Sequence, residues 1–215
     1  MESQKRQFTI YFLPMKTDEQ LIEDYIKTIK TAHNNTKKLF AIGFIGINGV
    51  GKSFVAKKLA EKIDLFIGSN DDIRRFLNNE GFEGVSPNQE LLQKIAEASG
   101  DWVYKNNISH IIDADLIKFQ EKAKVIAEQN GAKLFLIHLT CPEKIILERL
   151  QKRQQEISAN PQNNLSRVGV EEYLKRKGIH ETTPIQYVFF KINTSLEINP
   201  QIEELINKLK QEKVL

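Results

Sequence analysis

The stretch Gly46-Ile47-Asn48-Gly49-Val50-Gly51-Lys52-Ser53 matches the pattern G-x-x-x-x-G-K-[ST] of a phosphate-binding loop, here called the P-loop. An apolar run of strand length, residues 39–45, precedes it, and residues 54–62 follow with the spacing of a helix. A strand, a glycine loop and a helix in this order place consecutive backbone N–H groups and the positive end of the helix dipole around one anion. The alternative is a glycine-rich turn that opens an ordinary helix. The strand before the loop and the helix after it favour phosphate binding.

The P-loop predicts the residues that hold a nucleotide. Lys52 is expected to reach the β- and γ-phosphates, and the Ser53 hydroxyl is expected to ligate magnesium. The expected cofactors are therefore ATP and Mg²⁺. The residues predicted to contact ATP are Gly46, Asn48, Gly49, Val50, Gly51, Lys52, Ser53 and Phe54.

The composition is that of a globular protein. The chain has 215 residues, of which 40% are hydrophobic and 27% charged. It shows neither a signal-peptide pattern nor an apolar run long enough to cross a membrane, so we expect no membrane partner. The single cysteine, Cys141, cannot form an internal disulfide, which favours the cytoplasm. No feature indicates an oligomeric state.

Charge is spread unevenly along the chain. The net charge of +3 is too small to indicate nucleic acid as a partner, although a polynucleotide end stays among the candidate substrates. Residues 149–180 alone hold seven Lys and Arg against three Glu. This segment is therefore the most basic region that we identify.

Apolar runs alternate with helical segments along the chain. Because each run is continuous, we expect an α/β fold, a doubly wound α/β/α sandwich of three layers with a five-stranded parallel sheet. Residues 1–38 are expected to form an N-terminal arm, with a short strand at 8–13, and a helix, and residues 39–215 the main domain. The expected strands of the sheet are 39–45, 65–69, 108–113, 133–139 and 187–193. The expected helices are 17–32, 54–62, 71–79, 88–106, 116–130, 142–153 and 200–213, with a polar loop at 158–169.

Two acidic residues follow the second strand of the sheet. Asp71 with Arg74, or equally Asp72 with Arg75, would place a carboxylate and an arginine one helical turn apart at the mouth of the P-loop. The carboxylate could take a proton from a substrate hydroxyl, and the arginine could clamp an anionic substrate. The alternative is a helix start that carries Asp for capping.

The third strand also ends in carboxylates. Asp113 fits the Walker-B pattern, in which an aspartate after an apolar strand holds the magnesium shell, and Asp115 is expected to face substrate or cap a helix. The alternative is that both residues cap the helix that follows.

Arginines follow the fourth strand. Arg149 and Arg153 lie at i, i+4 on one helical face and could grip a transferring phosphoryl group, with Arg167 as a weaker candidate. The alternative is a solvated basic face. No spacing of His or Cys indicates a zinc site.

The order of these elements resembles the P-loop small-molecule kinases, a branch of the P-loop NTPases that includes kinases similar to polynucleotide and gluconate kinases, chloramphenicol phosphotransferases and zeta toxins. The resemblance covers about residues 40–210. Its S-x-D-x-x-R segment selects Asp71 as the general base and Arg74 as a substrate-binding residue. It also implies a LID at about residues 149–180, whose Arg149 and Arg153 close over the phosphates.

The chain departs from this family pattern at one place. After the third strand the family often has D-A-T or D-G-T with a following arginine. This chain has Asp113-Ala114-Asp115, and Lys118 is the basic residue that could serve in place of that arginine. We therefore predict ATP-dependent phosphoryl transfer to a hydroxyl of a small molecule or nucleotide-like substrate, with Asp113 contacting substrate and Mg²⁺. The alternative is a regulatory or toxin-type module that binds ATP with little or no turnover.

Overall fold

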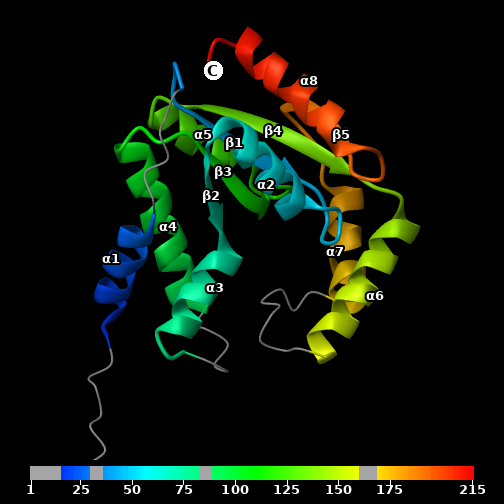
Figure 1. The fold of residues 1–215 in the computed structure, drawn as a ribbon, viewed down its shortest axis with the longest axis horizontal. Coiled ribbons are helices and arrows are strands. Elements are labelled where there is room, and N and C mark those ends of the chain that lie inside the picture. The colour runs from blue at the N-terminus through cyan, green and yellow to red at the C-terminus, as the bar shows by residue number, and fades with distance from the viewer. Residues whose placement is uncertain (1–15, 30–35, 83–88, 160–168) are drawn as a thin grey trace, which may run out of the picture.

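The computed structural model describes residues 16–29, 36–82, 89–159 and 169–215 (Figure 1). Its strands are β1 (Phe40–Ile45), β2 (Phe66–Ser69), β3 (His110–Asp115), β4 (Lys133–Thr140) and β5 (Val188–Asn193). Its helices are α1 (Asp18–Thr28), α2 (Lys52–Ile63), α3 (Asn70–Asn79), α4 (Gln89–Lys105), α5 (Gln120–Gln129), α6 (Glu143–Ala159), α7 (Val170–Thr182) and α8 (Ile198–Gln211).

The strands form one parallel sheet in the order β2-β3-β1-β4-β5. The central strand β1 is buried along its whole length, because helices cover both faces of the sheet. The predicted fold class, with a five-stranded parallel sheet, is therefore confirmed. Ligands in such sheets bind at the carboxyl ends of the strands, where the order reverses.

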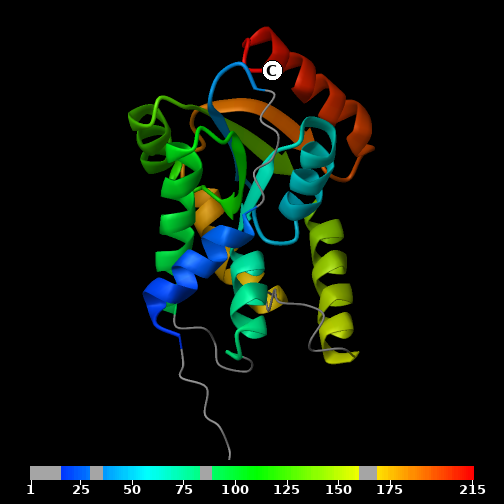
Figure 2. The same cartoon turned by 60° about the vertical axis from the view of Figure 1, so that its left-hand side comes forward.

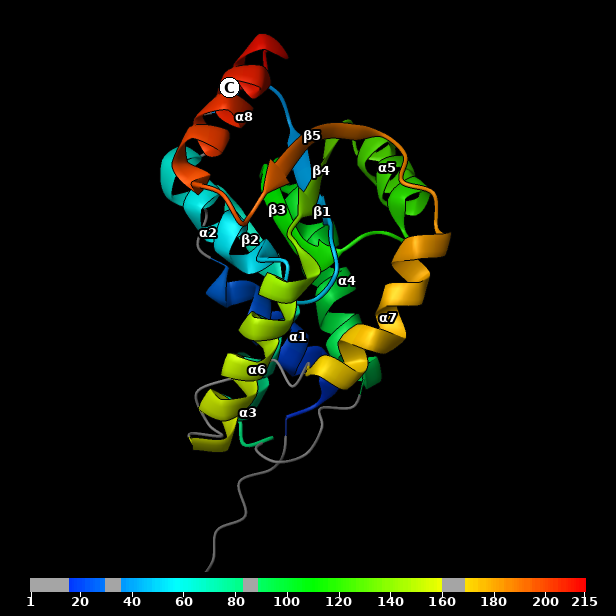
Figure 3. The same ribbon diagram turned by 90° about the vertical axis from the view of Figure 1, so that its right-hand side faces the viewer.

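Two helical layers enclose the sheet. Helices α2 and α8 pack on one face, in an apolar cluster that includes Leu59 and Leu205. Helices α4 and α5 cover the other face through smaller clusters, for example Tyr104 against Ala127. Figure 3 shows the two layers on opposite sides of the sheet, with α6 and α7 extending away from it.

Helix α1 shares a core with α3 and α4 (Figure 2). Leu21 is 1% exposed and packs in one cluster with residues such as Leu77 and Ile95. The helix begins with a capping box, in which Thr17 and Gln20 bond each other's backbone N–H groups. The strand predicted at 8–13 lies outside the described residues.

Some predicted boundaries were wrong. The third strand of the sheet runs from His110 to Asp115, two residues later than expected, because its pairing with β2 continues to Asp113 and the chain then crosses a bulge opposite Phe44. Helix α6 continues past Arg153 to Ala159, since no helix-breaking residue stops it. Helix α7 was not expected at all. No helix among the described residues is long and apolar enough to span a membrane.

Candidate phosphoryl-transfer site

The P-loop connects β1 to α2 in the geometry that its sequence predicts. Gly49 and Gly51 have φ values of 85° and 105°, a region that residues with a Cβ rarely enter. Helix α2 begins at Lys52 without a side-chain cap, so its first N–H groups stay available to an anion. The loop therefore has the backbone geometry that the phosphate-binding prediction requires.

Lys52 folds back onto the loop. Its Nζ donates to the carbonyl oxygens of Gly46 at 2.7 Å and Ile47 at 3.3 Å. Burial lowers the pKa of the Lys52 ammonium, although nearby Asp115 and Asp113 act to raise it. The buried Nδ2 of Asn48 has no hydrogen-bond partner within the described part of the chain. A buried cation and an unpaired donor in one loop fit a polyphosphate ligand.

Asp113 lies against Ser53 at the start of α2. Burial raises the pKa of the Asp113 carboxyl, while a hydrogen bond with Ser53 and the charge of Lys52 act to lower it. Asp71 and, to a smaller extent, Asp72 raise this pKa further. A divalent cation held by a hydroxyl and a carboxylate would relieve this repulsion, so the residues present fit Mg²⁺. The described residues contain no group of three or more His, Cys, Asp or Glu that could hold a metal ion.

Both possible Asp–Arg pairs at the start of α3 form ion pairs in the structure. Arg74 bonds Asp71 and Arg75 bonds Asp72, each at 2.5 Å. The second pair faces solvent more, since the Arg75 side chain is 62% exposed against 34% for Arg74. Asp71 also acts more strongly than Asp72 on the pKa of Asp113. The Asp71 pair is therefore the less exposed one and the one that acts more strongly on Asp113.

Arg149 of α6 contacts the outer side of the P-loop. Its Nη1 lies 3.3 Å from the Val50 carbonyl oxygen and 3.0 Å from Thr194 Oγ1, and its Nη2 donates to the Thr194 carbonyl oxygen at 2.7 Å. Thr194 follows β5 and also donates to the Val50 carbonyl at 2.5 Å. Sequence reasoning missed Thr194. Its position directly after an apolar strand was the only signal.

Two further arginines place positive charge near Lys52. The pKa of Lys52 is lowered, after burial, by the charges of Arg176 and Arg153. Arg176 belongs to α7 and was missed because no helix was expected there. Arg167 lies outside the described residues.

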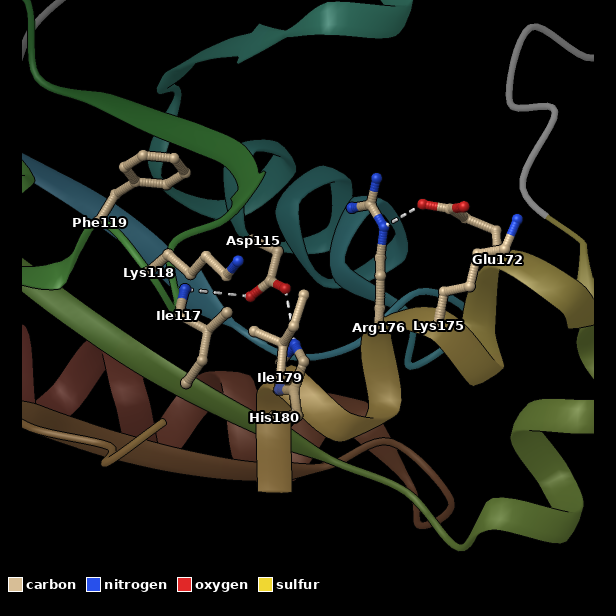
Figure 4. Close-up of a pocket in the computed structure, with 9 residues that line it drawn as sticks. All are labelled: Asp115, Ile117, Lys118, Phe119, Glu172, Lys175, Arg176, Ile179 and His180. Atoms are coloured by element: carbon tan, nitrogen blue, oxygen red, sulfur yellow. Dashed lines mark hydrogen bonds and ion pairs between the residues drawn. The ribbon is translucent and has the colours of Figure 1, made fainter. Parts of the chain in front are cut away.

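Asp115 connects the P-loop to α7. Its Oδ1 accepts hydrogen bonds from the backbone N–H of Gly46 at 3.2 Å and of Ile117 at 3.3 Å. Its Oδ2 lies 2.7 Å from Nε2 of His180 (Figure 4). Burial alone would raise the pKa of Asp115, but the His180 bond and the charge of Lys52 hold it below its ordinary value. His180 of α7 is thereby linked, through Asp115, to the first glycine of the P-loop.

Comparison with known families agrees with this geometry. A family model described as an AAA domain matches residues 42–169, more than half of the chain. The chain belongs to this AAA-domain family. The matched region of the AAA domain runs from β1 to the start of α7, so His180 and Thr194 lie beyond it.

Solved structures share the fold of this AAA domain. An APS kinase from Mycobacterium tuberculosis, in complex with AMPPNP and APS, is 15% identical, with a TM-score of 0.52 over 80% of this chain and 98% of that one. A gluconokinase from Sinorhizobium meliloti is 16% identical, with a TM-score of 0.50 over 81% and 93%. The PezAT toxin-antitoxin system of Streptococcus pneumoniae is 15% identical, with a TM-score of 0.55 over 92% and 74%. No curated protein sequence matches the chain. The fold is thus that of the P-loop small-molecule kinases.

Proposed function

We propose that this AAA domain transfers the γ-phosphate of ATP to a hydroxyl group of a small molecule or nucleotide-like substrate. The observation that carries the proposal is the position of Asp113, which bonds Ser53 of the P-loop and pairs in the sheet with Ser69, the residue that caps the acidic start of α3. A nucleotide-binding module needs Lys52 and Ser53. A transfer site also needs a carboxylate on the acceptor side, and Asp71 supplies it.

The P-loop residues would hold the nucleotide. Backbone N–H groups of residues 49–53 would bind the β-phosphate, and Lys52 would exchange its carbonyl contacts for phosphate oxygens. Ser53 and, through water, Asp113 would hold Mg²⁺, which when bound neutralises charge on the phosphates.

Asp71 is the proposed general base. It would accept the proton of the acceptor hydroxyl at a carboxylate oxygen, while Arg74, already paired with it, would orient the acceptor. Arg153 would face the transferring phosphoryl group. Arg149 would add positive charge from behind the loop, where it already bonds the Val50 carbonyl.

The fold neighbours support phosphotransfer. Two of them are an APS kinase, crystallised with AMPPNP and APS, and a gluconokinase. The single cysteine, Cys141, suits a reducing compartment, and we place the protein in the cytoplasm.

A toxin-type ATP-binding module is the second candidate. The PezAT system covers 92% of this chain, more than the 80% that the APS kinase covers. A toxin-type module would bind nucleotide without phosphorylating small hydroxylated metabolites. The Asp–Arg pairs at the start of α3 favour a kinase over a module that only binds nucleotide, because they supply a carboxylate for the acceptor.

The deciding experiment incubates the protein with labelled ATP, Mg²⁺ and a library of hydroxylated metabolites. We expect a phosphorylated product that disappears in Lys52→Ala, whose circular dichroism stays that of the wild type. Tight nucleotide binding without any product would refute the kinase proposal.

A matched pair of variants tests the base. Asp71→Asn should lower turnover by about 10²- to 10⁴-fold and leave ATP affinity unchanged, because a general base contributes about that much. Asp72→Asn, one residue along and paired with the more exposed Arg75, is the control and should stay within about threefold of the wild type. Loss of ATP affinity alone in Asp71→Asn would remove the proposed role.

A further inference from the structure

A pocket of about 350 Å³ lies between the segment that follows β3 and helix α7 (Figure 4). Its volume is at the lower end of the range for small-molecule sites, which suits a metabolite rather than a polymer. Asp115 and His180 line it, and Asp115 also bonds Gly46 of the P-loop. Asp115 therefore belongs to the pocket and also contacts the first residue of the P-loop.

The cationic side chains of this pocket outnumber its carboxylates. Lys118, Lys175 and Arg176 line it together with Asp115 and Glu172. The two carboxylates are already engaged, since Asp115 bonds His180 and Glu172 accepts from Nε of Arg176 at 2.7 Å. What the pocket can still offer a ligand is positive charge.

Two of these cations are available to a ligand. Lys118 forms no ion pair with any residue that the structure describes, and Figure 4 shows its side chain on the same side of the pocket as Asp115. Arg176 contacts Glu172 through Nε only, which leaves its terminal nitrogens for a second partner. Lys175 is instead paired with Glu171 at 2.8 Å. Lys118 and Arg176 thus approach the pocket from two different elements.

The pocket also has an apolar side. Phe119, which is 54% exposed, lines the pocket together with Ile117 and Ile179. Exposed aromatic surface next to free cations fits a ligand with a carbon frame and an anionic group. A neutral polyol would leave both cations without a partner.

We propose that the phosphate acceptor is a small hydroxylated oxyanion, a carboxylate or phosphate ester, whose anionic group binds Lys118 and Arg176 and whose carbon frame packs on Phe119. This inference rests on the proposed function and names its substrate class. The pocket is connected to the P-loop through Asp115, which lines the pocket and accepts a hydrogen bond from the backbone N–H of Gly46 at 3.2 Å.

The test uses the full-length protein and matched pairs of probes: gluconate with sorbitol, glycerate with glycerol, and glucose 6-phosphate with glucose. Binding is measured by calorimetry and by the shift in melting temperature, and transfer by labelled ATP. We expect at least one acid to bind and to accept phosphate, and its neutral partner to do neither. If no acid binds at millimolar concentration, the inference is overturned.

Variants separate this inference from the proposed function. Lys118→Met and Arg176→Gln should each weaken acid binding, and raise KM for the acid, by about 10- to 100-fold, the usual effect of losing a hydrogen bond to a charged group. KM for ATP should stay unchanged in Lys118→Met, because Lys118 is not among the charges that act on Lys52. Lys122→Met, on the exposed face of α5 and four residues from Lys118, is the control and should change neither. A neutral acceptor phosphorylated equally by wild type and both variants would overturn the inference and leave the kinase standing. Acid binding that the variants lose, without any transfer, would support the pocket and refute the kinase.

Discussion

His110, at the start of β3, should make the stability of the fold depend on pH. The side chain is 4% exposed, and its Nδ1 lies 3.1 Å from the Ile108 carbonyl oxygen. Its ring packs edge-on against that of Tyr104, with 4.8 Å between the two ring centroids. Burial lowers the pKa of His110 from 6.5 to about 4, although the Ile108 carbonyl acts to raise it. The folded protein therefore keeps this imidazole neutral over a range where the unfolded chain takes up a proton.

The sign and size of the effect follow from linkage. Between pH 6.5 and about 4 the unfolded state binds one more proton than the folded state, so the free energy of unfolding falls as the pH falls. One pKa unit corresponds to about 1.4 kcal/mol, so lowering the pH from 7 to 5 should remove about 2 kcal/mol through this residue alone. That is a large part of the ~5–15 kcal/mol that stabilises an ordinary domain.

The assay is urea unfolding of wild type and His110→Asn at pH 7 and pH 5. All other groups titrate in both proteins, so the difference between the two pH-dependent losses isolates His110. We expect the wild type to lose about 2 kcal/mol more than the variant. His138→Asn is the control. Burial also lowers the pKa of His138 on β4, but this side chain is only half-buried. Replacing His138 should therefore change the pH-dependent loss of stability by less than replacing His110. Equal losses in wild type and His110→Asn, or an NMR titration of His110 near pH 6.5, would refute the reasoning.

Three further predictions concern the P-loop and α1. Gly51→Ala should cost about 1–3 kcal/mol in urea unfolding and weaken ATP binding in calorimetry, because φ is 105° there; equal stability would show that the loop tolerates a Cβ. Arg149→Met should lower the melting temperature and ATP affinity together, because it removes the hydrogen bonds to Val50 and Thr194 that hold the P-loop; an effect on turnover alone would contradict this structural role of Arg149. Leu21→Ala should cost about 2–5 kcal/mol in urea unfolding, because the side chain is 1% exposed in the core of α1; a loss below about 1 kcal/mol would mean that α1 does not pack there.

The phosphate site could be predicted from the sequence because its parts are contiguous. A strand, a glycine loop and a helix within residues 40–63 set their own geometry, so Lys52 and Ser53 needed no distant partner to be recognised. The parallel sheet was predictable for a related reason, since continuous apolar runs occur where both faces of a sheet are buried.

The rest was decided by tertiary structure. The pairing of β2 with β3 puts Asp113 next to Ser69, and neither strand contains that register in its own sequence. His180 meets Asp115 across 65 positions, so nothing local marked it as a partner of the P-loop.

The sequence by itself therefore predicted a phosphate-binding loop at residues 46–53 and the parallel sheet that supports this loop. Only the fold decided what surrounds the loop. Arg149 and Thr194, 45 positions apart, close on the outer side of the loop, and Arg176 and Lys118 face a pocket on the other. Contacts of this kind depend on how helices dock on the sheet, and chain folding brings together side chains that no local pattern links.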